Sequence, residues 1–374
     1  MMMKLSASIA TNAMGDAMNT GQKQPFKPSR RTESNLAMTE PGVNPISNLG
    51  AVSHELRTPL TSIQGALGLL LSGKVDVQTR EGQQLLRIAA NNTKRLLRFT
   101  NAIEQDEFGS ASLISNEALE RLRLEADLQT AWDKEEFQLF YQPIVCLESE
   151  KILGFEALLR WDHPQRGFVP PTEFIPITEE TLLIHDLGLW VIEQACKQLR
   201  QWQQDFPHSS PLTCSVNLSA LQLLHSGFVE NVRQIYQDSG VIPGSLRVEI
   251  TESMFIENSP VAIAALQQLK GLNIPVYLDD FGTGYSSLAR LHQLSVDVLK
   301  IDRAFVTQEQ WEMIRGILHL ANSLGLDTIV EGVETQEELK QIQQLGCTKI
   351  QGYWFSRPLE EEKATILLQK GGKC

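Results

Sequence analysis

Acidic and amide side chains recur at the ends of short apolar runs from about residue 150 onward. Glu249, Asp279 and Glu331 each interrupt an apolar run whose composition is typical of a buried strand. A lone carboxylate in such a place is costly because it loses its hydration. Several carboxylates meeting at one point would also repel one another, and bound cations are the simplest way to balance that charge. The polar residues near the run ends are Glu156, Asn217, Glu249, Glu252, Asp279, Asp280, Lys300, Asp302, Glu331, Glu334 and Gln351.

The ligand types in this set indicate which cations would bind. The carboxylates and amides offer oxygen, and no His or Cys stands among them, so the set favours hard ions such as Mg²⁺ or Mn²⁺ over zinc. Asp279 and Asp280 are adjacent and could bridge two ions. Two ions about 4 Å apart can activate water and stabilise both oxygens of an in-line phosphoryl displacement. Lys300 could steer the attacking water or bind a phosphate.

Alternating strands and helices are expected to position these residues. The predicted strands are 137–147, 151–161, 212–219, 246–251, 275–280, 298–303, 327–333 and 349–355. The predicted helices are 182–206, 223–239, 261–272, 308–324 and 336–345. The first two strands should form an antiparallel hairpin because their connection is so short, and the others should be parallel. This order fits a TIM-type (β/α)8 barrel with an antiparallel first strand and catalytic groups at the carboxyl ends of strands. The pattern alone also allows a doubly wound open sheet.

The 374-residue chain is long enough for two domains, and its net charge of −12 is unevenly distributed. Residues 1–108 hold 12 Lys and Arg against nine Asp and Glu, whereas the remainder holds 21 against 36. Such an acidic domain should not bind a nucleic-acid polymer, and a phosphate-ester substrate would need cations to reverse the local field. No run of 18 apolar residues exists, which predicts no membrane span. Five scattered cysteines without CxxC spacing favour a reducing, cytoplasmic location.

The first 108 residues divide into a leader and a pair of helices. Residues 1–45 are rich in Ser, Thr, Asn, Gly and Pro and are expected to be disordered. In residues 46–108, two segments with apolar residues every three or four positions predict a helical hairpin. Two helices alone bury little apolar surface, so pairing with a second copy into a four-helix bundle is expected, which predicts a homodimer.

Glu156-Ala157-Leu158 and the later acidic motifs, taken in order, make residues 115–374 resemble the EAL family of cyclic di-GMP phosphodiesterases. The tripeptide alone carries little information, whereas the motifs together are specific. The resemblance implies a (β/α)8 barrel that uses two Mg²⁺ or Mn²⁺ ions to hydrolyse cyclic di-GMP to linear pGpG. One departure is Ala220-Leu221 after the Ser-Val-Asn-Leu-Ser motif, where the family often has an arginine.

The resemblance also implies a role for each site residue. The metal ligands would be Glu156, Asn217, Glu249, Asp279, Asp280 and Glu331, with Asp279 shared by the two ions. The catalytic positions would be Lys300 near the attacking water, Gln351 orienting water, Glu331, and Glu252 holding the loop 280–286. The substrate contacts would be Arg160 at a phosphate, with Glu156, Leu158 and Glu334.

A second motif, Ser53-His54-Glu-Leu-Arg-Thr-Pro-Leu60, resembles the phosphoacceptor helix of sensor histidine kinases. In that family the position of His54 is phosphorylated. Here the hairpin is followed directly by the phosphodiesterase-like domain, without an ATP-binding domain, so we do not expect autonomous kinase activity. His54 could accept a phosphoryl group from a partner histidine kinase or response regulator, or the hairpin could serve only for dimerisation. The alternatives to an active phosphodiesterase are a catalytically silent cyclic di-GMP receptor and a phosphorelay scaffold that signals through His54.

Overall fold

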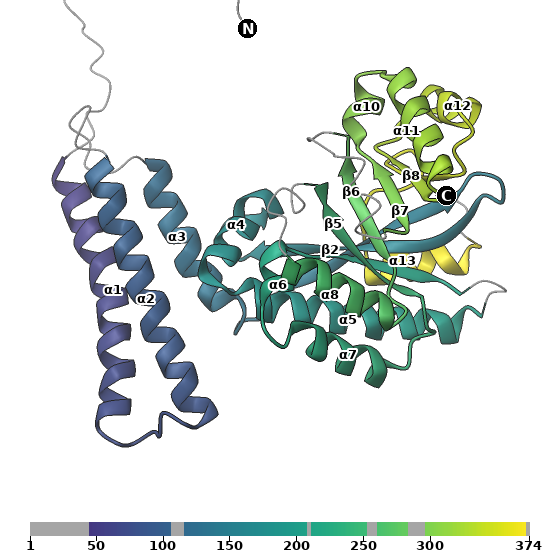
Figure 1. Cartoon of the computed structure of the whole chain (residues 1–374). Helices are drawn as coiled ribbons and strands as arrows, with labels where there is room; N and C mark the ends of the chain where they lie inside the picture. Colours follow the sequence, from purple (N-terminus) through teal and green to yellow (C-terminus); the bar gives the residue numbers. More distant parts are fainter. Residues whose placement is uncertain (1–44, 106–115, 208–210, 253–259, 283–295, 372–374) are drawn as a thin grey trace, which may run out of the picture. The chain divides into compact units, whose positions relative to one another are not determined.

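The structure, a computed structural model, describes residues 45–105, 116–207, 211–252, 260–282 and 296–371 (Figure 1). The chain divides into two compact units, Met1–Ser53 and His54–Cys374. The described part of the first unit is the start of helix α1. The predicted disordered leader lies outside the described residues, apart from Pro45.

Two long helices, α1 (Pro45–Leu71) and α2 (Arg80–Gln105), form where the sequence predicts a pair. The turn between them explains where each helix stops. Gly73 adopts a φ of 68° after the end of α1, a conformation that glycine reaches without steric cost. The Thr79 hydroxyl accepts a hydrogen bond from the Gly82 amide and so caps α2. None of the helices in the described residues is both long and apolar enough to cross a membrane.

Eight strands close into a barrel, which excludes the open doubly wound sheet. Strand β1 pairs antiparallel with β2 and β9, whereas every neighbouring pair from β2 through β4 to β9 is parallel. The predicted barrel with an antiparallel first strand is therefore confirmed. The barrel strands are β1 (Phe137–Cys146), β2 (Lys151–His163), β4 (Thr213–Asn217), β5 (Leu246–Thr251), β6 (Val276–Phe281), β7 (Val298–Ile301), β8 (Asp327–Glu331) and β9 (Lys349–Gln351). Two short strands, β3 (Gly167–Val169) and β10 (Leu359–Glu360), extend the sheet beside β2 and β1.

Helices cover the outside of the barrel, as the alternating pattern predicts (Figure 1). They pack on strands that are apolar on both faces, and the core includes Phe155 of β2 against Trp202, with ring centroids 4.6 Å apart. The helices that follow α2 are α3 (Asn116–Ala131), α4 (Pro171–Thr181), α5 (Ile184–Asp205), α6 (Ala220–Leu224), α7 (Phe228–Ser239), α8 (Pro260–Gly271), α10 (Arg303–Thr307), α11 (Trp311–Ser323), α12 (Gln336–Gln344) and α13 (Glu361–Gln369).

Four of these helices, α3, α4, α10 and α13, have no counterpart among the predicted helices. Helix α3 buries Leu124 and Leu128 in a cluster with Trp161 and Phe174, so tertiary packing stabilises it. Helix α4 begins at Pro171, a favourable first position whose missing N–H costs nothing there. Predicted strand 298–303 ends early at Ile301 because the side chain of Asp302 caps α10.

Candidate active site

The register of the barrel brings the predicted site residues together at the carboxyl ends of the parallel strands. Asn217 lies opposite Glu249, and Glu331 lies opposite Gln351. Across the antiparallel pair, Glu156 lies opposite Gln142 of β1. Asn217, Glu331 and Gln351 end their strands, and Glu249 lies two residues before the end of β5. Strand β2 runs on past Glu156, but the register places Glu156 beside Ser215, near the end of β4, so these side chains gather at one mouth of the barrel.

Lys300 stands at the centre of this arrangement. Its side chain is fully buried, and its Nζ lies 2.5 Å from Glu249 Oε2 and 2.6 Å from Glu331 Oε1. The same Nζ is 3.1 Å from both Glu156 Oε2 and Asp279 Oδ1. One ammonium group therefore contacts four carboxylates that come from four different strands.

Glu156 is the most firmly held of these carboxylates. Its Oε1 accepts a hydrogen bond of 2.7 Å from the Asn217 amide, and its Oε2 accepts one of 2.6 Å from the Gln351 amide. The Gln351 amide also donates to Gln142 Oε1 at 3.2 Å. These donors and Lys300 fix the orientation of the Glu156 side chain before any ligand arrives.

The turn after β6 places two acids next to each other. Asp280 has a φ of 55°, a left-handed conformation that non-glycine residues adopt at a cost of about 1–3 kcal/mol. This turn lets Asp279 and Asp280 both lie at the mouth. Glu252 supports the same turn, because its Oε2 accepts a hydrogen bond of 3.0 Å from the Gly282 amide. The loop that Glu252 is predicted to hold, 280–286, is described only as far as Gly282.

The pKa values show how crowded the negative charges are. Burial raises the pKa of Glu331 to about 8, and the charges of Asp279 and Glu156 add to this effect against the opposing charge of Lys300. Burial and the neighbouring charge of Asp279 raise the pKa of Asp280 to about 6. Burial also raises the pKa of Glu249 well above its ordinary value.

The pKa values of two other groups, Glu156 and Lys300, are shifted in favour of the charged form. Burial opposes ionisation of Glu156, but Lys300 and the amides of Gln351 and Asn217 lower the pKa of Glu156. Burial likewise opposes the charge on Lys300, but the surrounding carboxylates raise the pKa of Lys300 well above its ordinary value. At neutral pH the site thus holds the Lys300 ammonium against several carboxylates that cannot all ionise easily.

The donor set fits divalent cations. Glu156, Glu249 and Asp279 form one group, and Asp279, Asp280 and Glu331 form a second, with the ligand atoms of each group within 4.8 Å of one another. Asp279 belongs to both groups. In addition, Glu249 Oε1 is buried and has no hydrogen-bond partner within the described part of the chain. Oxygen-only donors of this charge suit hard cations, which would also relieve the repulsion.

A cavity of about 160 Å³ opens at this mouth. Its lining includes Glu156, Asp279, Glu331 and Gln351, and also Glu334, all predicted as site residues. The further lining residues were not predicted, and they are Gln142, Arg303, Gly332, Gly352 and Tyr353. The sequence does hold an indication of Gln142, since it is a polar residue inside a mostly apolar strand.

The remaining predicted residues, Arg160, Leu158 and His54, do not line the described part of this cavity. Arg160 and Leu158 are half-buried on β2. The Arg160 guanidinium donates to the Leu159 carbonyl and stacks 5.7 Å from the centre of the Phe140 ring. The backbone of His54 lies in α1, but its side chain is outside what the structure describes.

Residues 125–358 match the EAL domain, and the chain belongs to the EAL domain family. Residues 48–107 match the His Kinase A (phospho-acceptor) domain. Both resemblances noted in the sequence are therefore confirmed, whereas the roles of individual site residues stay predictions.

Two curated relatives and one solved structure show how far the similarity reaches. The bifunctional diguanylate cyclase/cyclic di-GMP phosphodiesterase MucR of Pseudomonas aeruginosa is 38% identical over 261 residues, 68% of this chain and 38% of MucR. The oxygen sensor protein DosP of Escherichia coli is 35% identical over 329 residues, 86% of this chain and 41% of DosP. The structure of the PaMucR phosphodiesterase in complex with c-di-GMP is 37% identical with a TM-score of 0.61, covering 65% of this chain and 99% of that one. The chain thus spans about two fifths of the length of these curated relatives.

Proposed function

We propose that this protein hydrolyses one phosphodiester bond of cyclic di-GMP to give linear pGpG, and that it uses two Mg²⁺ or Mn²⁺ ions. The observation that carries the proposal is the contact of Lys300 with four carboxylates at the mouth of an EAL-family barrel. The similarity to a phosphodiesterase solved with c-di-GMP supports the choice of substrate.

The protein groups have distinct tasks in this proposal. Glu156, Glu249, Asp279, Asp280 and Glu331, with Asn217, would hold the cations. When bound, the ions would polarise the phosphate and favour ionisation of the attacking water. Lys300 places a buried positive charge where negative charge develops on the phosphate oxygens. The Gln351 amide, already aligned by Glu156 and Gln142, would orient water at the same point.

The reaction adds water across one P–O3′ bond. The water oxygen bonds to phosphorus, the P–O3′ bond breaks, and the departing O3′ takes up a proton to become a hydroxyl. Hydrolysis of cyclic di-GMP in H₂¹⁸O with Mg²⁺ or Mn²⁺ should therefore place one ¹⁸O in the 5′-phosphate of pGpG, as measured by mass spectrometry. Binding of cyclic di-GMP without any turnover would instead support a silent receptor.

We further propose that the N-terminal hairpin pairs two copies of the chain and regulates the barrel. The proposed domain limits are residues 46–108 for the hairpin and 115–374 for the phosphodiesterase. Within a single chain the helices leave large apolar side chains exposed, among them Leu60 at 47% and Leu97 at 58%. A helix surface of this kind is stable in water when a second copy covers it.

Substitution of the hairpin tests the dimer. Leu56→Asp together with Leu60→Asp should shift the protein toward the monomer in analytical ultracentrifugation, because each places a charge in the proposed interface. His54→Ala is the matched control and should leave the mass unchanged. A fully dimeric double variant would show that the hairpin is not the main interface.

The role of His54 needs a separate measurement. Phosphotransfer from a partner histidine kinase or response regulator to wild type, but not to His54→Ala, would support regulation by phosphorylation. Phosphotransfer combined with no activity on cyclic di-GMP would instead favour a phosphorelay scaffold. We place the protein in the cytoplasm, because the four described cysteines are free thiols.

A further inference from the structure

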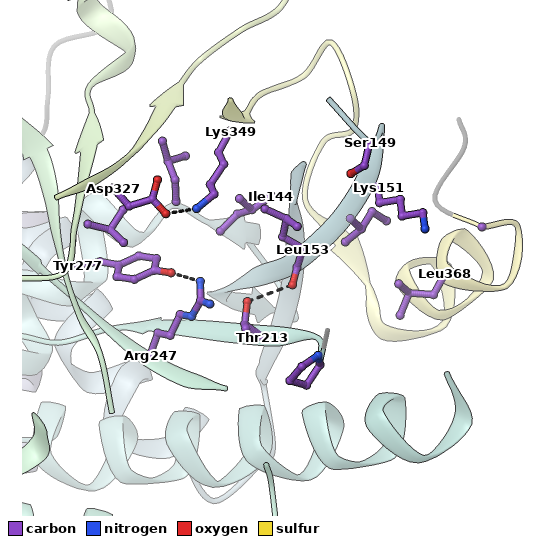
Figure 2. Close-up of a pocket in the computed structure, with 15 residues that line it drawn as sticks. Ile144, Ser149, Lys151, Leu153, Thr213, Arg247, Tyr277, Asp327, Lys349 and Leu368 are labelled. Atoms are coloured by element: carbon purple, nitrogen blue, oxygen red, sulfur yellow. Dashed lines mark hydrogen bonds and ion pairs between the residues drawn. The ribbon is translucent and has the colours of Figure 1, made fainter. Parts of the chain in front are cut away.

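Figure 2 shows a second cavity. The residues that line it place it at the opposite end of the barrel from the candidate active site. Its volume is about 460 Å³, within the range of pockets that hold small molecules. Its lining includes Asp327 and Lys349, the first residues of β8 and β9, whereas Glu331 and Gln351 end the same strands at the active site. The cavity therefore opens at the amino ends of the parallel strands.

Several side chains that line the cavity form one layer of the barrel interior, next to the layer of predicted site residues. Side chains two positions apart on a strand point to the same face. Arg247 precedes Glu249 by two residues, and Tyr277 precedes Asp279 by two. The same spacing relates Val298 to Lys300, Ile329 to Glu331 and Lys349 to Gln351.

Part of the cavity lining is apolar. Ile144, Tyr277, Val298 and Ile329 form a buried hydrophobic cluster of their own and also line the cavity. Tyr277 has the largest side chain in this cluster. The Arg247 guanidinium carbon lies 5.1 Å from the centre of that ring. An apolar or aromatic body would find matching contacts here.

The polar part of the lining is cationic. Arg247, Lys349 and Lys151 line the cavity, and Asp327 is the only carboxylate among the described residues that do so. The Arg247 guanidinium contacts the Tyr277 hydroxyl, and the Lys349 ammonium pairs with Asp327 (Figure 2). This excess of positive charge is unusual in a chain segment that holds 21 Lys and Arg against 36 Asp and Glu.

Two observations indicate that these cations are not fully balanced by the protein. Arg247 Nε is buried without a hydrogen-bond partner in the described part of the chain. Burial lowers the pKa of Lys349, and the positive charge of Arg247 lowers it further. A buried donor without an acceptor and two crowded cations both favour an added anion.

We propose that this cavity binds a small organic anion that carries a phosphate or carboxylate on an apolar or aromatic body. The anionic group would pair with Arg247 and Lys349, while Lys151 lies at the exposed rim. The body would rest on Tyr277 and Ile329. This site is separate from the phosphodiesterase site, so its test does not depend on turnover of cyclic di-GMP.

Isothermal titration calorimetry on the full chain, kept free of divalent ions, tests the proposal with two probes, 1-naphthyl phosphate and 1-naphthoate. We expect saturable binding of at least one probe with one site per chain. Arg247→Met and Lys349→Met should each weaken binding by about tenfold or more, as expected for a lost charge-assisted hydrogen bond. Binding of the phosphate alone or of the carboxylate alone would identify the anionic group.

Two control variants and one further test variant locate the site. Arg315→Met removes an exposed arginine paired with Glu312 on α11, and Glu156→Gln alters the active-site mouth. Both should bind the probe as wild type does. Lys151→Gln changes an exposed residue and should weaken binding in a folded protein even if Arg247→Met fails to fold. Failure of wild type to bind either probe, or wild-type affinity in the folded Lys349→Met and Lys151→Gln variants, would overturn the proposal.

Discussion

Lys300 shows how a single residue can organise a site made of mutually repelling groups. A buried lysine would normally lose its charge, yet four carboxylates at 2.5–3.1 Å keep it protonated. The same contacts hold the carboxylates where cations would need them. Among the described residues of the mouth, Arg303 is a further cation that lines the cavity. We propose that Arg303 meets the anionic substrate of the proposed reaction.

Arg303 therefore offers a prediction at the residue scale. Arg303→Ala should raise the KM for cyclic di-GMP by about tenfold, because a charge-assisted contact to phosphate is lost. Steady-state kinetics should show a smaller change in kcat than in KM. Arg315→Ala on the exposed face of α11 is the control and should leave both constants unchanged. An unchanged KM in the Arg303 variant would remove this residue from the substrate site.

The strand-end turns position the site at the level of elements. Gly332 follows Glu331 with a φ of 72°, and a Cβ there would lie 2.2 Å from the Cβ of Arg303. This glycine thus lets the end of β8 approach the start of α10. The close approach brings Glu331 and Arg303 to the same cavity.

Alanine at this turn should disturb both stability and activity. Gly332→Ala should lower the free energy of unfolding by more than the roughly 1 kcal/mol expected for backbone strain alone, because Arg303 must also move. Gly325→Ala is a matched control, since Gly325 has a φ of 69° but open space around a Cβ. Chemical denaturation of both variants separates the two effects. Equal losses would mean that the contact with Arg303 is unimportant.

The sequence was most informative where polarity breaks an apolar strand. Glu249 stands inside such a strand, so its burial could be predicted, and so could its convergence with Lys300 at one mouth. The place of Arg303 in the site could not be predicted, because Arg303 begins a helix that depends on the Asp302 cap. Strand 298–303 was predicted to run through both residues. A capping side chain offers the backbone a local hydrogen bond that competes with strand pairing, and the spacing of apolar residues gives no information on that competition.

Tertiary packing explains the elements that the sequence did not reveal. Helix α3 has little amphipathic pattern, and its stability comes from burying Leu128 beside Trp161. Its acidic side chains also reach distant residues, since Asp127 lies 3.3 Å from His163 Nε2 and Glu120 pairs with Arg166. Helix α4 contains Pro176, which argues against a helix in a sequence pattern. Pro176 nevertheless lies in the middle of α4, between the buried residues Phe174 and Ile177.

At the scale of the whole molecule, the acidic barrel should depend on cations for stability as well as for chemistry. The pKa of Glu331, about 8, lies above its ordinary value of 4.5, so the metal-free native state binds an extra proton between these values. The stability of the metal-free protein should therefore fall as pH rises through this window. A cation that binds Glu331 must displace the proton of this carboxyl group below its pKa but not above it.

Mg²⁺ or Mn²⁺ should consequently raise the melting temperature more at pH 8.5 than at pH 6. Thermal denaturation with saturating metal and with EDTA at each pH measures the difference. The Glu331→Gln variant cannot ionise at this position and should show a much weaker dependence on pH. A metal effect that is equal at both pH values in the wild type would contradict this electrostatic account.

The most direct test of the central claim is turnover of cyclic di-GMP by wild type and Glu156→Ala, with Mg²⁺, Mn²⁺ and EDTA compared in one assay. We predict that wild type forms pGpG only with a divalent ion, and that Glu156→Ala loses at least about 100-fold of kcat, because the ligand held by Asn217, Gln351 and Lys300 is gone. Equal turnover by a folded Glu156→Ala variant, or full activity in EDTA, would contradict the assignment of this barrel mouth as a two-metal phosphodiesterase site.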